Sequence, residues 1–213
     1  MGMETGSPVL VLMRHGQSED NERDLFSGLR DPALTARGME EARAAGRALR
    51  ALGLHFDGAV TSRLQRAQAT LALLLDELGH PSLPVQVTAA LNERDYGALA
   101  GLNKTEARSR FGSEQVRAWR KSYEAVPPGG ESLAMAAARV WPFFDACIAP
   151  RVRSGESVLV VAHGNSLRAL LVHLDRLAPE AIEEVNIGNA GFLIYEANAD
   201  GQWGRRAGVK MPI

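Results

Sequence analysis

Short apolar runs alternate along the chain with longer stretches in which apolar residues recur every three or four positions. The short runs predict β-strands and cover residues 9–13, 58–61, 85–87, 157–162 and 192–195. The run at 157–162 reads Ser-Val-Leu-Val-Val-Ala and is the most continuous of them. Because it is apolar at nearly every position, it predicts a strand that is buried on both faces of a sheet.

The longer stretches have helical spacing. They predict α-helices at residues 35–52, 64–78, 104–123, 132–151 and 166–175. Thr35 is a suitable N-cap for the first of these helices, and Gly53 and Gly79 lie where two of them should end. The polar stretch 104–123 fits either one helix or two, and Pro142 predicts a kink in its helix.

Strands that alternate with helices are typical of an α/β fold with a mainly parallel sheet. The chain has 213 residues, of which 46% are hydrophobic, and this suits one domain with a sizeable core. No repeat or low-complexity tract divides the sequence. We therefore expect a single domain over residues 1–213, with residues 1–8 as a flexible tail.

The balance of charge argues against several classes of partner. The net charge is −1 at pH 7, so no general basic field exists to recruit nucleic acid or an anionic membrane. No apolar run approaches the roughly 18–20 residues of a membrane span. The one cysteine, Cys147, has no partner for an intrachain disulfide, and its apolar neighbours predict a buried core thiol. These features favour a soluble protein of the cytoplasm.

Two histidines directly follow predicted strands. His15 follows the strand at 9–13, and His163 follows the strand at 157–162. Open α/β sheets bind ligands beyond the carboxyl ends of their strands, and the glycine after each histidine would let a ligand approach the backbone. The pair therefore predicts a functional site, the alternative being two ordinary loop residues. The other histidines are interpreted as surface residues, namely His55, His80 and His173.

Neutral imidazole is a competent nucleophile near pH 7, and phosphoryl transfer depends mainly on positioning and on stabilisation of negative charge. Arg14 and Arg66 are candidates to supply that positive charge, the alternative being solvated surface arginines. The sequence has no metal-ligand spacing such as His-Glu-x-x-His and no Walker loop, so we expect no metal. Glu93 is the candidate general acid, since a nearby phosphate would raise its pKa; the alternative is a surface carboxylate.

Several motifs resemble the histidine phosphatase superfamily over residues 9–195. Its opening signature is similar to Arg14-His15-Gly16-Gln17-Ser18-Glu19 with Asn21, and its second arginine segment is similar to Thr61-Ser62 followed by Leu64, Arg66 and Ala67. Four segments resemble its 2,3-bisphosphoglycerate-dependent phosphoglycerate mutases: Leu91-Asn92-Glu93-Arg94 with Tyr96-Gly97, Gly101-Leu102-Asn103-Lys104, Trp119-Arg120-Lys121-Ser122-Tyr123 and Pro127-Pro128-Gly129-Gly130-Glu131-Ser132. The resemblance implies a three-layer αβα fold of the phosphoglycerate mutase type.

The resemblance also implies roles for the matching residues. His15 would carry the phosphoryl group, and Glu93 would act as general acid and base. Arg14, Arg66 and His163 would hold the transferring group, assisted by Asn21 and the Gly164 amide. The residues implied to bind the rest of the substrate are Ser27, Gly28, Tyr96, Lys104, Arg120, Lys121, Asn165 and Asn189.

The implied reaction interconverts 3-phosphoglycerate and 2-phosphoglycerate, with 2,3-bisphosphoglycerate as the primer and without a metal. The expected partner is thus a small phosphorylated carboxylic acid, and neither nucleic acid nor a membrane. Many such mutases form dimers or tetramers, so a homo-oligomer is an expectation of the resemblance as well.

The chain departs from the mutase pattern on the substrate side of the implied site. Leu29 replaces a usual Trp, Lys121 replaces a second Arg, Asp20 replaces an aromatic residue, and residues 186–192 lack the usual Thr-Gly-x-Pro. Two alternatives therefore stay open. One is a phosphatase that transfers the phosphoryl group from His15 to water, and the other is a protein that binds phosphorylated ligands without catalysis.

Overall fold

A computed structural model describes residues 7–198 and 202–206 of the chain. Residues 1–6, 199–201 and 207–213 lie outside the described part, and with them most of the tail expected at residues 1–8. A six-stranded sheet in the order β3-β2-β4-β1-β5-β6 lies at the centre. Its strands are β1 (Val9–Arg14), β2 (Gly58–Ser62), β3 (Val85–Thr88), β4 (Val158–Ala162), β5 (Phe192–Ala197) and β6 (Trp203–Arg205).

The sheet is mainly parallel, as the alternation of strands and helices predicts. β4 lies between β1 and β2, with Val160 opposite Leu12 on one side and opposite Val60 on the other. β3 continues the parallel part beside β2. β5 pairs antiparallel with β1, and β6 pairs antiparallel with β5. No strand is predicted from the sequence at 203–205, because three residues carry too little periodicity to be recognised.

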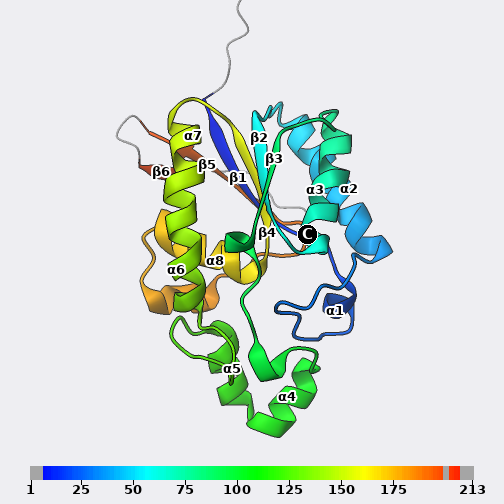
Figure 1. Ribbon diagram of the computed structural model, residues 1–213, viewed down its shortest axis with the longest axis vertical. Helices are drawn as coiled ribbons and strands as arrows, with labels where there is room; N and C mark the ends of the chain where they lie inside the picture. Colours follow the sequence, from blue (N-terminus) through cyan, green and yellow to red (C-terminus); the bar gives the residue numbers. More distant parts are fainter. Residues whose placement is uncertain (1–6, 199–201, 207–213) are drawn as a thin grey trace, which may run out of the picture.

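Helices cover both faces of the sheet and give the expected three-layer αβα arrangement (Figure 1). One face carries α2 (Ala36–Ala51) and α3 (Gln65–Leu78), and the other carries α6 (Leu133–Phe143), α7 (Ala149–Arg153) and α8 (Gly164–Leu174). Successive side chains of a strand point to opposite faces. In β1, Val11 and Met13 accordingly belong to the core under α2 and α3, whereas Leu10 and Leu12 belong to the opposite core.

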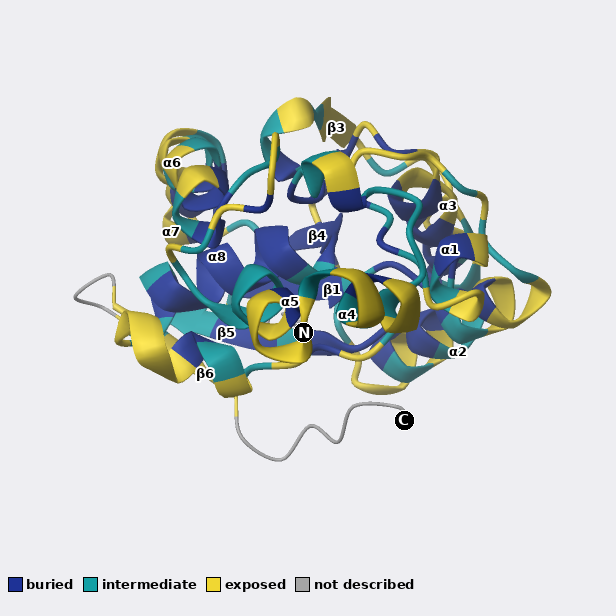
Figure 2. Cartoon of the chain, turned by 90° about the horizontal axis from the view of Figure 1, so that it is seen from below, coloured by how far each residue is buried: buried dark blue, intermediate teal, exposed yellow. Residues whose placement is uncertain are grey.

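Two further helices, α4 (Lys104–Phe111) and α5 (Ser113–Lys121), form a cap beyond the carboxyl ends of the parallel strands. Figure 2, which views the molecule from below, shows this cap in front of the buried strands β1 and β4. The cap packs on a small core of its own, which includes Phe26, Leu99 and Val116. Gly112 separates the two helices with a φ of 85°, a conformation that residues with a Cβ rarely adopt. The stretch 104–123 therefore forms two helices.

The remaining elements are short. They are α1 (Glu19–Glu22), the 3-10 turns η1 (Ala89–Leu91), η2 (Gly97–Leu99) and η4 (Pro179–Glu184), and the π-helical turn η3 (Phe144–Ile148). The turn η3 interrupts the helix expected at 132–151, shortly after Pro142, which lacks the N–H of a regular helical hydrogen bond. Cys147 lies on this turn and is half-buried, so the prediction of a buried core thiol was wrong.

The helix expected at 166–175 begins two residues earlier, at Gly164. Its first turn is closed by Ser166, whose hydroxyl accepts a hydrogen bond of 3.1 Å from the N–H of His163. A polar side chain three residues into a helix commonly caps the first turn in this way. The helix therefore starts directly after His163, and its first N–H groups lie at the carboxyl edge of the sheet.

Candidate functional site

The parallel pairing of β1 and β4 brings the two predicted histidines together. Arg14 lies opposite Ala162 at the end of the ladder, and the N–H of His15 donates to the Ala162 carbonyl at 3.0 Å. The next residue on each strand is a histidine, and the ring centroids of His15 and His163 are 5.0 Å apart. Both rings are buried. The alternative of two ordinary loop histidines does not fit this arrangement.

One ring nitrogen of His15 is left available for chemistry. Its Nδ1 lies 2.7 Å from the carbonyl oxygen of Gly16, and a carbonyl can only accept, so Nδ1 carries the proton. Its Nε2 then has a lone pair, toward which the Nε–H of Arg66 donates at 3.3 Å. The backbone therefore fixes the tautomer that presents Nε2 as a nucleophile.

The charge state of both histidines follows from their surroundings. Burial is the main cause that holds the pKa of His15 well below its ordinary value of 6.5, and the positive charges of Arg66 and Arg14 act in the same direction. Burial and the charge of Arg66 also lower the pKa of His163 well below 6.5. Because imidazole is nucleophilic only when neutral, the site keeps His15 in its reactive form at neutral pH.

Arg66 and Arg14 donate hydrogen bonds to backbone carbonyls, and Arg66 Nη1 also lies 4.0 Å from Asp31 Oδ1. Arg66 extends from α3, and its two terminal nitrogens donate to the carbonyls of Arg30 at 2.7 Å and Gly28 at 3.1 Å. Arg14 donates from Nη1 to the Ile187 carbonyl at 2.7 Å. The buried Nε of Arg14 has no hydrogen-bond partner among the described residues. A buried donor in this condition is available to a ligand with acceptor oxygens.

Glu93 faces the same space. One of its carboxylate oxygens, Oε1, accepts the N–H groups of Arg94 at 2.8 Å and Asn165 at 3.1 Å. A Cβ placed on Gly164 would lie 3.8 Å from the other oxygen, Oε2, and the same Cβ would lie 3.9 Å from Arg14 Nε. Glu93 is thus buried with one oxygen fixed and one directed at the ligand space, which is not the geometry of a surface carboxylate.

The two positions that follow the histidines are occupied by glycine for different structural reasons. At Gly164 a Cβ would meet its neighbours at ordinary contact distance, within the ligand space. At Gly16 a Cβ would lie 2.2 Å from the Gly38 carbonyl oxygen. The prediction that both glycines admit a ligand was therefore wrong for Gly16, which is needed because the start of α2 crosses the loop of His15 at close range.

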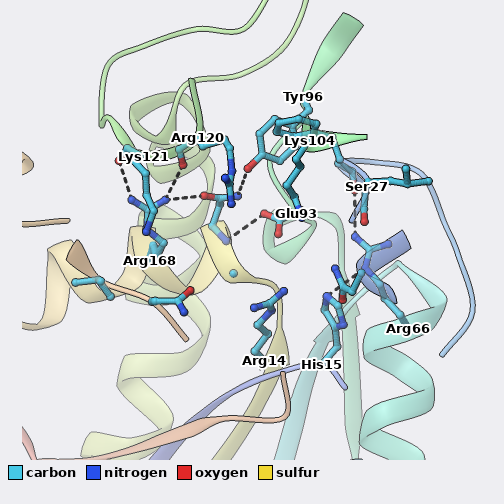
Figure 3. A pocket seen from close by; sticks show the side chains of 18 residues that line it. Arg14, His15, Ser27, Arg66, Glu93, Tyr96, Lys104, Arg120, Lys121 and Arg168 are labelled. Carbon is cyan, nitrogen blue, oxygen red and sulfur yellow. Dashed lines mark hydrogen bonds between the residues drawn. The ribbon is translucent and has the colours of Figure 1, made fainter. Parts of the chain in front are cut away.

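Most of the predicted site residues line one pocket (Figure 3). The predicted residues that line it are Arg14, His15, Asn21, Ser27, Gly28, Arg66, Glu93, Tyr96, Lys104, Arg120, Lys121, Gly164 and Asn165. His163 is not one of the residues that line the pocket, but its ring centroid is 5.0 Å from that of His15, and its Nε2 is 2.7 Å from the Ser62 hydroxyl. Asn189 is half-buried and is not one of the pocket residues.

The pocket has two ends, with Glu93 between them. We call Arg14, His15, Arg66 and His163 the histidine end. We call Lys104, Arg120 and Lys121, which come from the cap, the cationic end (Figure 3). Lys104 is paired with Asp24 at 2.6 Å. Burial and the charges of Arg168 and Arg120 lower the pKa of Lys121, which shows that like charges are gathered at this end.

Sequence reasoning missed five residues of the pocket wall: Leu25, Phe26, Arg168, Val185 and Asn186. Arg168 ends the segment His163-Gly164-Asn165-Ser166-Leu167-Arg168, which also resembles the superfamily, but the resemblance gave it no role in the site. Val185 and Asn186 follow η4 in a segment without periodicity. Their places depend on how the chain returns from α8 to β5, which local sequence does not specify.

In the described part of the chain no three His, Cys, Asp or Glu side chains come together as a metal site. Within the same residues no helix is both long and apolar enough to cross a bilayer.

The chain is similar to known proteins in sequence and in structure. A 2,3-bisphosphoglycerate-dependent phosphoglycerate mutase of Parvibaculum lavamentivorans is 54% identical over 193 residues, which cover 91% of this chain and 92% of the relative. A protein of the same name from Brucella canis is 56% identical over 194 residues, or 91% of this chain and 94% of the relative.

Among solved structures, a mycobacterial glucosyl-3-phosphoglycerate phosphatase superposes with a TM-score of 0.81 at 28% identity, covering 93% of this chain and 97% of the other. The family model of the histidine phosphatase superfamily, branch 1, matches residues 10–209. That match spans both strand-end histidines and the whole pocket, and the chain belongs to the histidine phosphatase superfamily.

Proposed function

We propose that the protein interconverts 3-phosphoglycerate and 2-phosphoglycerate, a step of glycolysis and gluconeogenesis, through a phosphohistidine on His15. The observation that carries the proposal is the two-ended pocket, which pairs a buried neutral histidine with a separate cationic end. The relatives at 54–56% identity bear the name of this activity. A substrate with a phosphate at one end and a carboxylate at the other matches both ends at once.

The charges of the site fit 2,3-bisphosphoglycerate as the primer. Arg14 and Arg66 lie at the histidine end, and the unpartnered Arg14 Nε offers a hydrogen bond to a phosphoryl oxygen. Arg120 and Lys121 lie at the other end, ready for the second anionic group. When bound, the bisphosphate supplies the phosphoryl group that makes the enzyme active.

In the proposed reaction His15 Nε2 forms a bond to phosphorus as the bond from phosphorus to the substrate oxygen breaks. Glu93 Oε2 donates a proton to that leaving oxygen and takes one from the hydroxyl that later attacks the phosphohistidine. Arg14, Arg66 and His163 hold the oxygens of the transferring group, and the N–H of Gly164 at the start of α8 is suited to the same task. Nδ1 of His15 stays protonated throughout, because it donates a hydrogen bond to the Gly16 carbonyl.

A second candidate, a phosphomonoester phosphatase, has specific support. Leu29 is 47% exposed at the position where a usual Trp is absent, and Asn186, which lines the pocket, is exposed too. Water is excluded from such a site by what closes over it. In addition, the solved structure with a TM-score of 0.81 is a phosphatase by name.

A coupled assay distinguishes the two candidates. Formation of 2-phosphoglycerate from 3-phosphoglycerate is followed with and without trace 2,3-bisphosphoglycerate, in the presence of EDTA, while inorganic phosphate is measured in parallel. The mutase proposal predicts EDTA-resistant isomerisation that the bisphosphate stimulates, and its loss in His15→Asn. Steady release of phosphate without isomerisation would instead establish the phosphatase.

The proposal includes a single domain over residues 1–213, action without a metal, and a cytoplasmic location. It assigns Asn21, Ser27, Gly28, Tyr96 and Asn165 to substrate binding on the basis of their places in the pocket wall. It leaves Asn189 without a contact to substrate. Size-exclusion chromatography with light scattering measures whether the homo-oligomer expected from the family forms.

A further inference from the structure

Two buried arginines hold the end of α5, the helix that carries the cationic end of the pocket. Arg168, on α8, donates from Nη1 to the Arg120 carbonyl at 3.2 Å and from Nη2 to the Lys121 carbonyl at 2.8 Å (Figure 3). Arg94 approaches the same turn with Nη2 at 2.7 Å from the Trp119 carbonyl and 3.4 Å from that of Arg120. Both arginines are buried.

The end of α5 needs these arginines for an electrostatic reason. The last carbonyls of a helix have no partner within the helix, and together they carry a partial negative charge. Here that negative end lies at a pocket suited to an anion, because Arg120 and Lys121 are the last two residues of α5. Guanidinium groups on these carbonyls satisfy their hydrogen bonds and offset the charge that would oppose an anionic ligand.

Arg168 also ties this helix end to the rest of the site. Its Nη1 donates to Asn165 Oδ1 at 2.9 Å, and its Nη2 donates to the Ile182 carbonyl in η4 at 2.9 Å. With its oxygen engaged, the Asn165 amide directs its NH₂ group to the Tyr96 hydroxyl at 3.2 Å. Four acceptors thus occupy the two terminal nitrogens of Arg168. Because both terminal nitrogens already donate to protein acceptors, only the Nε–H remains for a ligand. Such a side chain is suited to fixing the positions of the groups that it binds.

We propose that Arg168, with Arg94 beside it, is a positioning residue that sets the specificity of the pocket for substrates with a second anionic group, by fixing the C-terminal turn of α5. Through that turn it places Arg120 and Lys121 at the end of the pocket away from His15. The inference deepens the proposed function and rests on it for the identity of the ligand.

The test compares two ligands that differ in how much of the pocket they occupy. Inorganic phosphate needs only the histidine end, whereas 3-phosphoglycerate reaches both ends. Their dissociation constants are measured by calorimetric titration for the wild-type protein, Arg168→Met, Arg168→Lys and Arg117→Met. Arg117 is the matched control, since it lies on the exposed face of α5 and is paired only with Glu183 and Glu184 among the described residues.

We expect Arg168→Met to raise the dissociation constant for 3-phosphoglycerate about tenfold, the loss typical of hydrogen bonds to a charged group. The dissociation constant for inorganic phosphate should change less than about twofold. Arg168→Lys keeps the charge but cannot bridge the four acceptors, so its loss should be close to that of Met. Arg117→Met should bind both ligands as the wild type does. In steady-state assays the same variants should show a raised KM with a smaller change in kcat.

Equal weakening of both ligands in Arg168→Met would overturn the proposal, since it would indicate a general loss of structure. Unchanged binding of 3-phosphoglycerate, or full recovery in Arg168→Lys, would overturn it as well, the latter because charge alone would then suffice. Failure of the proposed function looks different: the wild-type protein itself would bind 3-phosphoglycerate no more tightly than phosphate.

Discussion

At the scale of single residues, the site depends on groups whose ordinary properties are changed by burial. His15 is neutral because it is buried beside two arginines, and its tautomer is set by one backbone carbonyl. Glu93 is oriented by two N–H groups on one of its oxygens. Neither effect requires an unusual side chain; each requires a particular neighbour.

Replacing Glu93 tests its role directly. Glu93→Gln keeps the size of the side chain but removes the transferable proton, so we expect kcat to fall by about 10²- to 10⁴-fold. The amide oxygen can still accept the N–H of Arg94, and the fold should persist. Steady-state assays with both phosphoglycerates measure the loss, and Glu114→Gln, an exposed acid on α5, is the control. Activity of Glu93→Gln near that of the control would rule out the assigned role.

The lowered pKa of His15 and that of His163 predict how stability depends on pH. Below about pH 6.5 these histidines gain protons in the unfolded chain but stay neutral in the folded protein. The unfolded state then binds more protons, so the free energy of unfolding should fall as the pH is lowered from 7.5 to 5.5. The slope is at most about 1.4 kcal/mol per pH unit for each histidine.

Urea denaturation at several pH values measures this dependence. His15→Asn should show a shallower fall of the free energy of unfolding with decreasing pH, because one of the two proton-binding differences is removed. His55→Asn, at an exposed position, should show the wild-type slope. Identical slopes in all three proteins would contradict the lowered pKa values as the cause.

At the scale of elements, the loop after β1 and the start of α2 interlock through two glycines. A Cβ on Gly38 would lie 2.0 Å from the Gln17 carbonyl oxygen, just as one on Gly16 would meet Gly38. The N–H of Gly16 also donates to the Thr70 hydroxyl of α3 at 3.1 Å. The position of His15 therefore depends on how closely two helices approach its loop.

Gly38→Ala should separate these elements. Because the clash is with backbone, no side chain can move aside, and we expect a loss of about 3 kcal/mol in the free energy of unfolding. Activity should fall as well, since the loop of His15 must shift. Gly188→Ala is a suitable control, because a Cβ there meets nothing within 4 Å. Chemical denaturation of both variants measures the difference, and equal stability would show that the helix start gives way.

At the scale of the whole molecule, the pocket is formed between two parts with separate cores. The histidine end lies at the edge of the central sheet, whose strands β1, β2 and β4 are almost completely buried. The cationic end stands on the cap, whose core is small. Substrate would join the two parts, since its anionic groups reach both ends.

Amide hydrogen exchange tests this division. We expect the amides of α4 and α5 to exchange before those of β1 and β4, because few buried contacts oppose opening of the cap. Addition of 3-phosphoglycerate should slow exchange in α5 far more than in β4. Uniform protection, or the same effect of ligand in both places, would show that the cap and the sheet open as one unit.

Much of this molecule could be predicted from local sequence. The strands at β1, β2 and β4 are continuous apolar runs, and Thr35 and Gly79 mark the observed ends of two helices. The two histidines were identified as a pair because each follows such a strand. These features depend on periodicity and on residues near in sequence, so the chain by itself determined the alternation of strands and helices, the mainly parallel sheet and the edge at which the site lies.

Only the tertiary structure decided the rest. It showed that Gly16 is needed for the close approach of α2, that Cys147 is half-buried, and that Arg168 donates a hydrogen bond to the end of α5. Each of these depends on a partner more than 20 residues away or on which side of an element faces solvent. Pairing across such separations is set by packing of the whole chain, whereas sequence periodicity reports only which face of an element is apolar.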